Sequence, residues 1–282
     1  MLQADLPGGP IGRDIDYGTA DFQRITEILH EVSGIRMPPT NEALVFSRLS
    51  RRVRELGMSR FCDYVDHVQA ARNADEREAM VEALTTNTTR FFREGYHFDT
   101  LAEALLPDLV QKARAGARAA LVGRLLDGEE AYSIAAVVLK HFAEAGRHDL
   151  RILATDISRR VLAVAERAEY PADRAEAITP ELAALMFERG GEKLRIRPAL
   201  RELVSFRYMN FMEPWPVTGP FDAIFCRNVM IYMEDDVQAR VWAGLASVLA
   251  PGGTLFTGHS ERIGPELKGS LQMVGKTTFR RV

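Results

Sequence analysis

The feature that most constrains the fold is a regular alternation, from about residue 117 onward, of short apolar runs with amphipathic segments. The short runs predict strands, and the segments between them show the three- and four-residue apolar spacing of helices. Strands are predicted at 119–123, 151–155, 221–225 and 253–258, and helices at 129–145, 158–166 and 235–249. Strands and helices in this order form a mostly parallel sheet covered on both faces, so the predicted fold class is α/β.

Two parts of this region depart from the alternation. Near the end of the chain, two apolar runs separated by Gly275-Lys276 predict a hairpin, so the last strand is expected to be antiparallel. Between the second and third predicted strands lies an insertion at about 170–207, in which 194–197 and 203–207 predict small antiparallel strands. We therefore expect one sheet domain with a small subdomain inserted into it.

The rest of the chain precedes this sheet domain, and its length suggests a second domain. Residues 1–17 are rich in Gly, Pro and Asp and predict a mobile tail. Residues 18–84 show helical periodicity, and Pro38-Pro39 separates the first helix from the second. Residues 85–116 are predicted to form a linker and a helix that lead into the sheet domain, which spans about 117–282.

The second predicted helix, at 42–56, is basic. Its apolar stripe consists of Phe46, Leu49, Val53 and Leu56. The rest of its surface carries Arg48, Arg51, Arg52 and Arg54. This pattern is as typical of a solvated helix face as of a docking surface for an acidic partner.

Composition excludes several classes of function. Lys and Arg number 36 against 39 Asp and Glu, and this near-neutral balance argues against a nucleic-acid-binding protein. Cys62 and Cys226 stand far apart without metal-ligand spacing, so neither disulfides nor a metal site is expected, and a cytoplasmic setting fits best. The start of the chain does not resemble an export signal, and the apolar runs fall short of the roughly 20 residues that span a membrane, so membrane insertion is not expected.

Polar residues follow three of the predicted strands. In an open parallel sheet, ligands bind beyond the carboxyl ends of the strands, where the strand order reverses. The first strand leads into Gly128-Glu129-Glu130, the second ends at Asp156, and the third ends at Cys226-Arg227-Asn228. An acid after the second strand can accept hydrogen bonds from both hydroxyls of a ribose, although Asp156 could also cap the helix that follows.

The loop after the first strand narrows the choice of nucleotide cofactor. Gly123 and Gly128 are separated by bulky residues, and neither the GxGxxG pattern nor a P-loop is present. Both patterns serve to bind phosphates through backbone amides. The sequence therefore favours a nucleoside cofactor without phosphates, of which S-adenosylmethionine is the common one.

Five stretches of the chain carry a resemblance to a known family. They read NTTRFFR, DGEEAYS, LATDI, FDAIFCRNVMIY and GHSE and lie at 87–93, 127–133, 153–157, 221–232 and 258–261. With them, the chain resembles the bacterial chemotaxis receptor methyltransferases, the CheR family, from about Phe22 to Phe279. The resemblance implies a helical N-terminal domain, a class I S-adenosylmethionine-dependent methyltransferase sheet of Rossmann-like topology and a small antiparallel subdomain. It also implies methylation of glutamate carboxylates on chemoreceptors, which tunes adaptation in chemotaxis signalling, with S-adenosylhomocysteine as the product.

The resemblance also implies roles for particular residues. The family's cofactor contacts fall on Asn87, Thr89, Arg93, Glu130, Asp156, Asn210, Phe211, Arg227 and Asn228. Arg93 would also hold the incoming carboxylate, and Tyr232 would hydrogen-bond near the transferring methyl group. Structural roles are the alternatives, since Asn87 could cap a helix and Arg227 could pair with a neighbouring acid. Because receptor methylation helices are rich in Glu, the four arginines of the basic helix become candidate receptor-binding residues.

Two departures from the family pattern affect these expectations. Before its Gly-Glu-Glu the family has small residues, whereas this chain has Arg124, Leu125 and Leu126, and Ala131 replaces a proline. This leaves a second hypothesis, a relative with impaired catalysis that acts as a receptor-binding adaptor. The turn at 190–193 is shorter than in family members that bind a receptor tail peptide, so tail-peptide binding is not expected.

Overall fold

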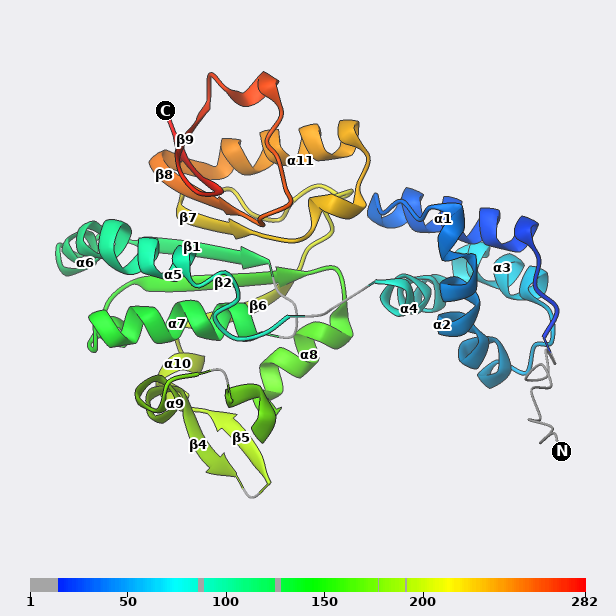
Figure 1. Cartoon of the computed structure of the whole chain (residues 1–282), viewed down its shortest axis with the longest axis horizontal. Coiled ribbons are helices and arrows are strands. Elements are labelled where there is room, and N and C mark those ends of the chain that lie inside the picture. The colour runs from blue at the N-terminus through cyan, green and yellow to red at the C-terminus, as the bar shows by residue number, and fades with distance from the viewer. Residues whose placement is uncertain (1–14, 86–88, 125–127, 177, 191) are drawn as a thin grey trace, which may run out of the picture. The chain divides into compact units, whose positions relative to one another are not determined.

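The computed structural model describes residues 15–85, 89–124, 128–176, 178–190 and 192–282 (Figure 1). The chain divides into two compact units, one built on the first four helices and one that contains both sheets. Among the helices of the described part, none has the length and hydropathy that crossing a membrane requires.

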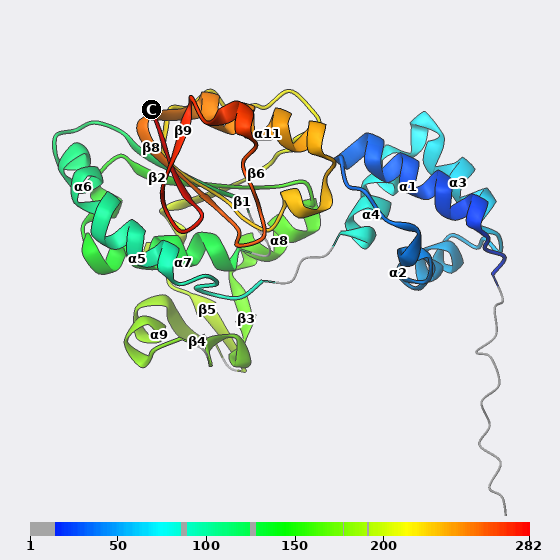
Figure 2. The ribbon, with the colours of Figure 1, turned by 45° about the horizontal axis from the view of Figure 1, so that its top comes forward.

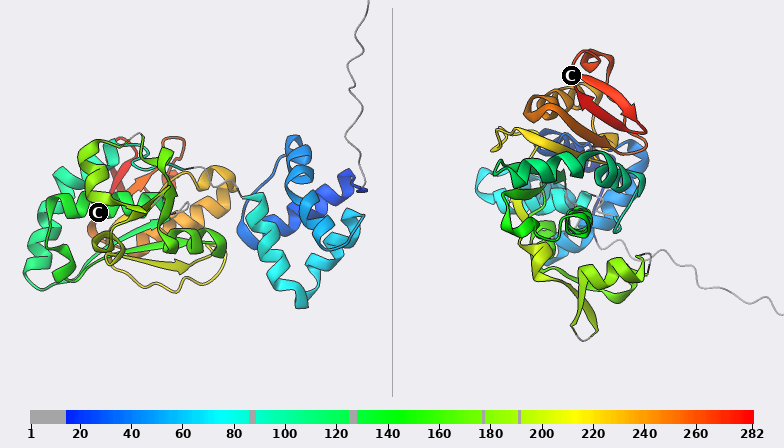
Figure 3. Two further views of the ribbon diagram at one scale, coloured as in Figure 1. Left: turned by 90° about the horizontal axis from the view of Figure 1, so that it is seen from below. Right: turned by 90° about the vertical axis from the view of Figure 1, so that its left-hand side faces the viewer.

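The first unit is helical, as expected for 18–84, and Figure 3 shows its helices packed against one another. It consists of α1 (Thr19–Ser33), η1 (Pro39–Asn41), α2 (Glu42–Glu55), α3 (Phe61–Gln69), η2 (Ala71–Asn73) and α4 (Ala74–Leu84). The buried stripe of α2 is Val45, Leu49 and Val53, spaced four residues apart. The prediction that Leu56 belongs to this stripe is wrong: α2 ends at Glu55, and Leu56 is exposed.

The second unit begins with α5 (Tyr96–Thr100), the π-helical turn η3 (Leu101–Leu105) and α6 (Leu106–Arg114). Its main sheet contains β1 (Ala119–Arg124), β2 (Leu150–Asp156), β6 (Val204–Tyr208), β7 (Phe221–Cys226), β8 (Leu249–Thr257), β9 (Leu271–Gly275) and β10 (Thr278–Arg281). The strand order is β6-β2-β1-β7-β8-β10-β9, with β10 antiparallel to both of its neighbours and the other pairs parallel. The predicted α/β class and antiparallel end are confirmed.

Helices cover both faces of the main sheet. α7 (Glu129–His141) and α8 (Arg159–Arg167) pack on one face, and α11 (Asp235–Val248) packs on the other (Figure 1). Along β1 the buried residues alternate between the two cores, so that Leu121 faces α7 and Val122 faces α11. Short 3-10 turns, η4 (Ala145–Arg147), η6 (Met230–Tyr232) and η7 (Pro265–Leu267), complete the connections. Strands buried on both faces explain why they read as continuous apolar runs.

A small antiparallel sheet projects from this unit (Figure 2). It consists of β3 (Glu169–Pro171), β5 (Lys193–Ile196) and β4 (Phe187–Gly190), in that spatial order, and is accompanied by η5 (Ala172–Ala175), α9 (Pro180–Met186) and α10 (Pro198–Arg201). The strand predicted at 194–197 is therefore present as β5.

The antiparallel strand predicted at 203–207 is wrong. These residues form β6, which pairs in parallel with β2 at the edge of the main sheet. Val204 and Phe206 are buried toward the α7 core, while Ser205 and Arg207, which alternate with them, are exposed. This alternation resembles that of a small surface strand, because only one face of β6 is covered.

Candidate active site

The strand order places the candidate site at the carboxyl ends of β1, β2, β6 and β7. The chain extends the sheet from β1 to β2 and β6, and then returns to add β7 on the other side of β1. This reversal is the switch point at which open α/β sheets bind ligands. Asp156 ends β2, Asn210 follows β6, and Arg227-Asn228 follow β7, so the polar strand ends singled out in the sequence belong to neighbouring strands.

Asp156 is buried and held by its own loop. Its Oδ1 accepts a hydrogen bond from the amide of Ser158 at 2.8 Å, and its carbonyl accepts one from the amide of Met209 at 3.0 Å. The cap of α8 is Ser158, whose hydroxyl accepts from the amide of Val161 at 3.1 Å. The alternative that Asp156 caps the helix is therefore wrong, and the position stays consistent with a ribose-binding acid.

Gly128 shapes the entry into α7. Its φ is +92°, and a Cβ there would lie 2.7 Å from the hydroxyl of Tyr170 and 2.8 Å from the Cβ of Ala165, so only glycine fits. The sharp turn places Glu129 and Glu130, both buried, in the first turn of α7, where the helix dipole stabilises negative charge. Leu125, Leu126 and Asp127 of the preceding loop lie outside the described residues.

Arg227 lies at the centre of a buried polar cluster. Its side chain is 1% exposed, and its guanidinium pairs with Glu130 Oε2, with Nε at 2.7 Å and Nη2 at 2.5 Å. Nη1 donates to the carbonyl of Arg93, and the group lies 5.4 Å from the ring centroid of Phe98. The alternative that Arg227 pairs with a neighbouring acid is what the structure shows, and a contact with the cofactor stays a prediction.

Two residues that sequence reasoning missed, Glu94 and His97, extend this cluster. His97 is fully buried, with Nδ1 3.2 Å from Nη1 of Arg227 and Nε2 3.0 Å from the hydroxyl of Thr277. Because Arg227 can only donate, His97 Nδ1 accepts and Nε2 carries the proton. Burial and the charge of Arg227 lower the pKa of His97 to about 4, against the opposing charge of Glu94, so its ring is neutral.

Glu94 connects the cluster to His259. Its Oε1 accepts from Nδ1 of His259 at 2.8 Å and from the His259 amide at 3.2 Å. Burial alone would raise the pKa of Glu94, but the hydrogen bonds from His259 and the charge of Arg227 hold it below its ordinary value. His259 is thus a hydrogen-bonding residue at a strand end, as predicted. The sequence did offer a signal for Glu94 and His97, because these two titratable residues closely follow the 87–93 stretch.

The linker segment before Glu94 has an unusual backbone. Phe92 and Glu94 have φ values of +53° and +58°, and the amide of Phe92 donates to the hydroxyl of Ser133 at 3.0 Å. Left-handed residues other than glycine cost about 1–3 kcal/mol each and cluster at functional sites. Arg93 between them has its carbonyl bound to Arg227 and a half-buried side chain. Asn87 lies outside the described residues.

Glu261 joins the loops after β7 and β8, and its role was also missed. One carboxylate oxygen accepts from the amides of Val229 at 2.6 Å and Met230 at 2.8 Å, and the other accepts from the amide of Gly258 at 2.6 Å. The segment that Glu261 fixes ends at Tyr232, a residue that is 41% exposed. The GHSE stretch offered a signal for this role of Glu261: it places an acid just after a strand, and an acid that is buried there needs several hydrogen-bond donors.

The remaining predicted contacts lie near these strand ends. Oδ1 of Asn210 accepts from the amide of Met212 at 3.0 Å, and the ring of Phe211 lies 5.3 Å from that of Trp215. The carbonyl of Thr89 accepts from Arg174, which also pairs with Glu129 at 3.1 Å. Asn228 is buried with a φ of +57°.

The charge of the site fits a cationic nucleoside. Among the described residues, the buried carboxylates are Glu129, Glu130, Asp156 and Glu261, and the buried guanidinium is Arg227. An excess of buried negative charge disfavours phosphates and favours the positive sulfonium and amino groups of S-adenosylmethionine. The buried side chains present therefore fit this cofactor.

Comparison with known families agrees with this chemistry. Residues 87–280 match the family described as "CheR methyltransferase, SAM binding domain", and residues 20–85 match "CheR methyltransferase, all-alpha domain". The chain belongs to the CheR methyltransferase family. The CheR assignment makes it an S-adenosylmethionine-dependent methyltransferase, as the resemblance predicted.

Individual CheR relatives match over nearly their whole length. A probable chemotaxis protein methyltransferase of Rhizobium etli is 38% identical, with 90% of this chain and 96% of that one aligned. Chemotaxis protein methyltransferase 2 of Pseudomonas aeruginosa is 36% identical, with 95% of each chain aligned. The chemotaxis protein methyltransferase of Escherichia coli is 34% identical over 92% of this chain and 90% of that one. None of these matches favours the adaptor alternative.

The four arginines of α2 separate into two pairs. Arg48 donates to the carbonyl of Leu84 at 2.6 Å, and Arg52 binds both carboxylate oxygens of Glu76 at 2.8 and 2.6 Å. These two stabilise the helical unit. Arg51, whose side chain is 78% exposed, and Arg54 lie on the surface, so they carry the basic face that the sequence attributed to all four.

Proposed function

We propose that this CheR methyltransferase methylates the γ-carboxylate of glutamate side chains on the cytoplasmic region of chemoreceptors and thereby tunes adaptation in chemotaxis signalling. The match of both family domains to the two units of the chain carries the proposal. The proposed substrate places the reaction in the cytoplasm.

The cofactor is held, in this proposal, at the carboxyl ends of the strands. Asp156 binds the ribose hydroxyls, Glu130 faces the cationic groups, and Asn210 with Phe211 borders the adenine. Arg227 keeps Glu130 in place through their ion pair, and Thr89, Arg93, Asn228 and Asn87 complete the contacts. Bound S-adenosylmethionine supplies a methyl group on a positive sulfur, which is a strong electrophile.

The chain's own contribution to the reaction is mainly positioning. A glutamate carboxylate with a pKa of about 4.3 is already ionised at neutral pH, so methyl transfer requires no strong base. One carboxylate oxygen forms a bond to the methyl carbon as the carbon–sulfur bond breaks, and no proton moves. Alignment of two reactants can remove on the order of 7–11 kcal/mol of barrier. Arg93 binds the incoming carboxylate, and Tyr232 hydrogen-bonds beside the methyl group.

The test is transfer of a labelled methyl group to a purified cytoplasmic receptor fragment. Arg93→Ala and Tyr232→Phe should each lower kcat/KM by about 100-fold, because each removes a group that positions the reactants. Arg90→Ala, an exposed arginine three residues earlier, is the matched control and should stay near the wild-type rate. Wild-type rates in both site variants would refute these roles, and no label on the receptor glutamates would refute the function.

Receptor docking is proposed to use Arg51 and Arg54. Their exposed positive charge suits helices rich in glutamate, and the one ion pair that either forms among the described residues, between Arg51 and Glu55 at 3.4 Å, is exposed and weak. Arg48 and Arg52, by contrast, are held within the unit. The Arg51→Glu/Arg54→Glu variant should raise KM for the receptor about tenfold and leave S-adenosylhomocysteine affinity unchanged. Arg72→Glu, an exposed charge reversal in the same unit, is the control. Equal KM values in both variants would contradict this docking surface.

Docking is further proposed not to need a receptor tail peptide. β4 and β5 pair from Gly190 with Lys193, so two residues separate the paired strands along the chain. A turn of this length offers little backbone for an added peptide. Titration with the C-terminal peptide of the receptor should therefore give no binding, and micromolar affinity would contradict the proposal.

A further inference from the structure

One part of the main sheet has no helix over it. The connection from β6 to β7, residues 209–220, contains no helix, although a sheet of this type normally has a helix after each strand. Arg151 and Leu153 of β2, and Ser205 and Arg207 of β6, face the side that α11 covers elsewhere. Their shared face follows from the register, in which Ala120 pairs with Arg151 and Leu153 pairs with Ser205. None of these four side chains is fully buried.

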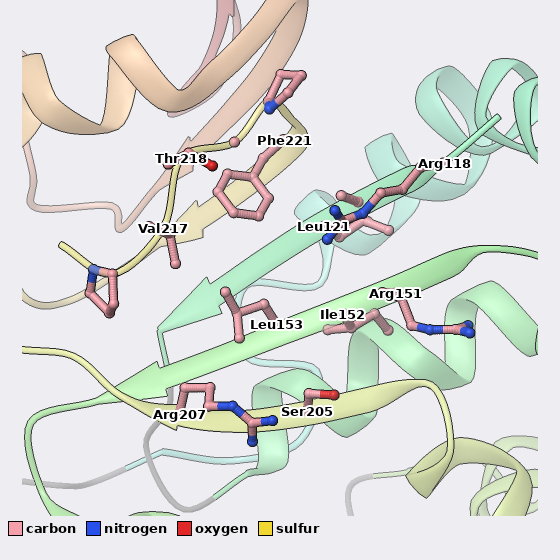
Figure 4. A pocket seen from close by; sticks show the side chains of 14 residues that line it. Arg118, Leu121, Arg151, Ile152, Leu153, Ser205, Arg207, Val217, Thr218 and Phe221 are labelled. Atoms are coloured by element: carbon pink, nitrogen blue, oxygen red, sulfur yellow. The ribbon is translucent and has the colours of Figure 1, made fainter.

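A cavity of about 330 Å³ lies on this open face. Its floor is formed by β1, β2 and β6, and its wall is the loop from Pro216 to Pro220 (Figure 4). Val217 of the loop lies opposite Leu153 across the cavity, and Thr218 lies beside Phe221 (Figure 4). The volume lies within the range of small-ligand sites, about 300–1,000 Å³.

The wall of this cavity is fixed to α11. Gly219 has a φ of +65°, and a Cβ there would overlap the carbonyl oxygen of Val248, so the loop makes a close backbone contact with the end of α11. A Cβ at Gly244 would lie 2.6 Å from the ring of Trp215, so this indole rests directly on the helix. The loop is therefore held as a preformed wall, which lowers the cost of binding.

Three arginines line the cavity, and two of them, Arg118 and Arg207, form no ion pair with any residue that the structure describes. Arg118 has no hydrogen bond or ion pair with any residue that the structure describes, and Nη1 of Arg207 donates to the carbonyl of Phe206. Arg151 forms a long ion pair with Asp149 at 3.9 Å, and its Nη1 donates to the carbonyls of His148 at 3.2 Å and Leu150 at 2.9 Å, which leaves Nη2 for a ligand. Asp222, at the start of β7, is already bound to Lys112 at 2.6 Å and to the amide of Ala120 at 2.9 Å.

We propose that this cavity binds a phosphorylated small molecule of mononucleotide size. A guanidinium binds phosphate through two parallel hydrogen bonds, and a phosphate monoester carries up to two negative charges at neutral pH, which suits the end of the cavity where Arg118 and Arg151 lie. Arg118 and Arg151 lie at the amino ends of β1 and β2, and Arg207 lies near the other end (Figure 4). The apolar body of the ligand packs between Leu153 and Val217, and the hydroxyls of Ser205 and Thr218 bind its polar edge.

This site is separate from the candidate active site and does not depend on the proposed function. It contains none of the residues assigned to S-adenosylmethionine, and its charge is positive where that of the active site is negative. A phosphate-bearing ligand is therefore expected here, at a site that methyl transfer does not use.

Calorimetric titration of the full chain tests this proposal. The probes are guanosine monophosphate, adenosine monophosphate, inorganic phosphate and a glutamate-rich peptide. A mononucleotide should bind below millimolar concentration, more tightly than inorganic phosphate, and more weakly as salt is raised. Arg151→Gln and Arg207→Gln should each weaken binding about tenfold, because each removes charge-assisted hydrogen bonds.

Two control variants separate this site from general charge and from the active site. Arg72→Gln removes an exposed charge in the helical unit, and Asp156→Asn changes the proposed cofactor site, and neither should alter mononucleotide binding. No binding at millimolar mononucleotide, equal affinity in Arg207→Gln and wild type, or binding of the acidic peptide alone would overturn the proposal. Loss of mononucleotide binding in Asp156→Asn alone would assign the ligand to the active site and would also overturn it.

Discussion

The carboxyl ends of the main strands and the open face over β2 and β6 both carry charged residues, but in opposite ways. At the carboxyl ends, Arg227, Glu130 and Glu261 are buried, and each is held by several short hydrogen bonds. On the open face, Arg118 and Arg207 are exposed and have no acidic partner among the described residues. Both regions lie on the same sheet.

The difference shows what burial requires of a charge. A charge removed from water must be paired and hydrogen-bonded, so the carboxyl-end cluster depends on the exact set of groups within it. An exposed arginine is solvated and has hydrogen-bonding capacity left for a ligand. Substitutions in the carboxyl-end cluster and on the open face should therefore differ in their effect on the free energy of unfolding, and this contrast can be measured.

The largest effect is expected at Arg227. Arg227→Met leaves Glu130 buried without its cation, and breaking a buried ion pair in this way costs about 3–5 kcal/mol of unfolding free energy. Urea denaturation measures the loss. Arg195→Met removes one half of the exposed pair with Glu169 and should barely change stability. A similar, small effect of both substitutions would contradict the contrast.

His97 should make stability depend on pH. Its pKa is about 4 in the folded chain and about 6.5 in the unfolded chain, so in this window only the unfolded chain takes up the proton. The unfolding free energy should therefore fall by up to about 3 kcal/mol as the pH drops from about 6.5 toward 4. His97→Gln should remove this slope above pH 5, whereas His141→Gln, at an exposed histidine, should keep it. An unchanged slope in His97→Gln would show that another group titrates.

A smaller effect is expected at Glu261. Glu261→Gln keeps one oxygen acceptor but turns an NH2 group toward a backbone amide, which leaves a buried donor unsatisfied at a cost of about 1–3 kcal/mol. Urea denaturation of this variant beside Glu202→Gln, at an exposed glutamate, measures the difference. Equal stability of the two variants would mean that the three backbone bonds to Glu261 do not hold the loops together.

The smallest effect is expected on the open face. Arg118→Gln and Arg207→Gln should each change the unfolding free energy by no more than about 0.5 kcal/mol, because both side chains are exposed. A loss of several kcal/mol in either variant would show that these arginines are structural and would remove the contrast between the two regions.

Sequence patterns predicted the parts of this molecule that depend on local order. The apolar runs located β1, β7 and β8, because strands buried on both faces leave a continuous signal, and they located β2 although one of its faces is partly open. The pattern of β6 was misread, since its alternation does not reveal which sheet it joins. Asp156 could be singled out because its role depends on its position at a strand end.

The rest of the site depends on contacts between distant segments. Glu94, His97 and Glu261 matter because the fold brings them to Arg227, His259 and the loop amides, and no spacing along the chain records this. Likewise, Arg48 and Arg52 were grouped with Arg51 and Arg54 because helical periodicity does not show that Glu76 and the Leu84 carbonyl lie within their reach.

Calorimetric titration with S-adenosylhomocysteine tests the central claim, a cofactor site at the carboxyl ends of the strands, most directly. The wild-type chain should bind with micromolar affinity, and Asp156→Asn should weaken binding about 100-fold or more, because two charge-assisted hydrogen bonds to the ribose are lost. Asp149→Asn, just before the opposite end of β2, should bind as the wild type does. No binding at millimolar ligand, or equal affinity in Asp156→Asn and wild type, would contradict the account.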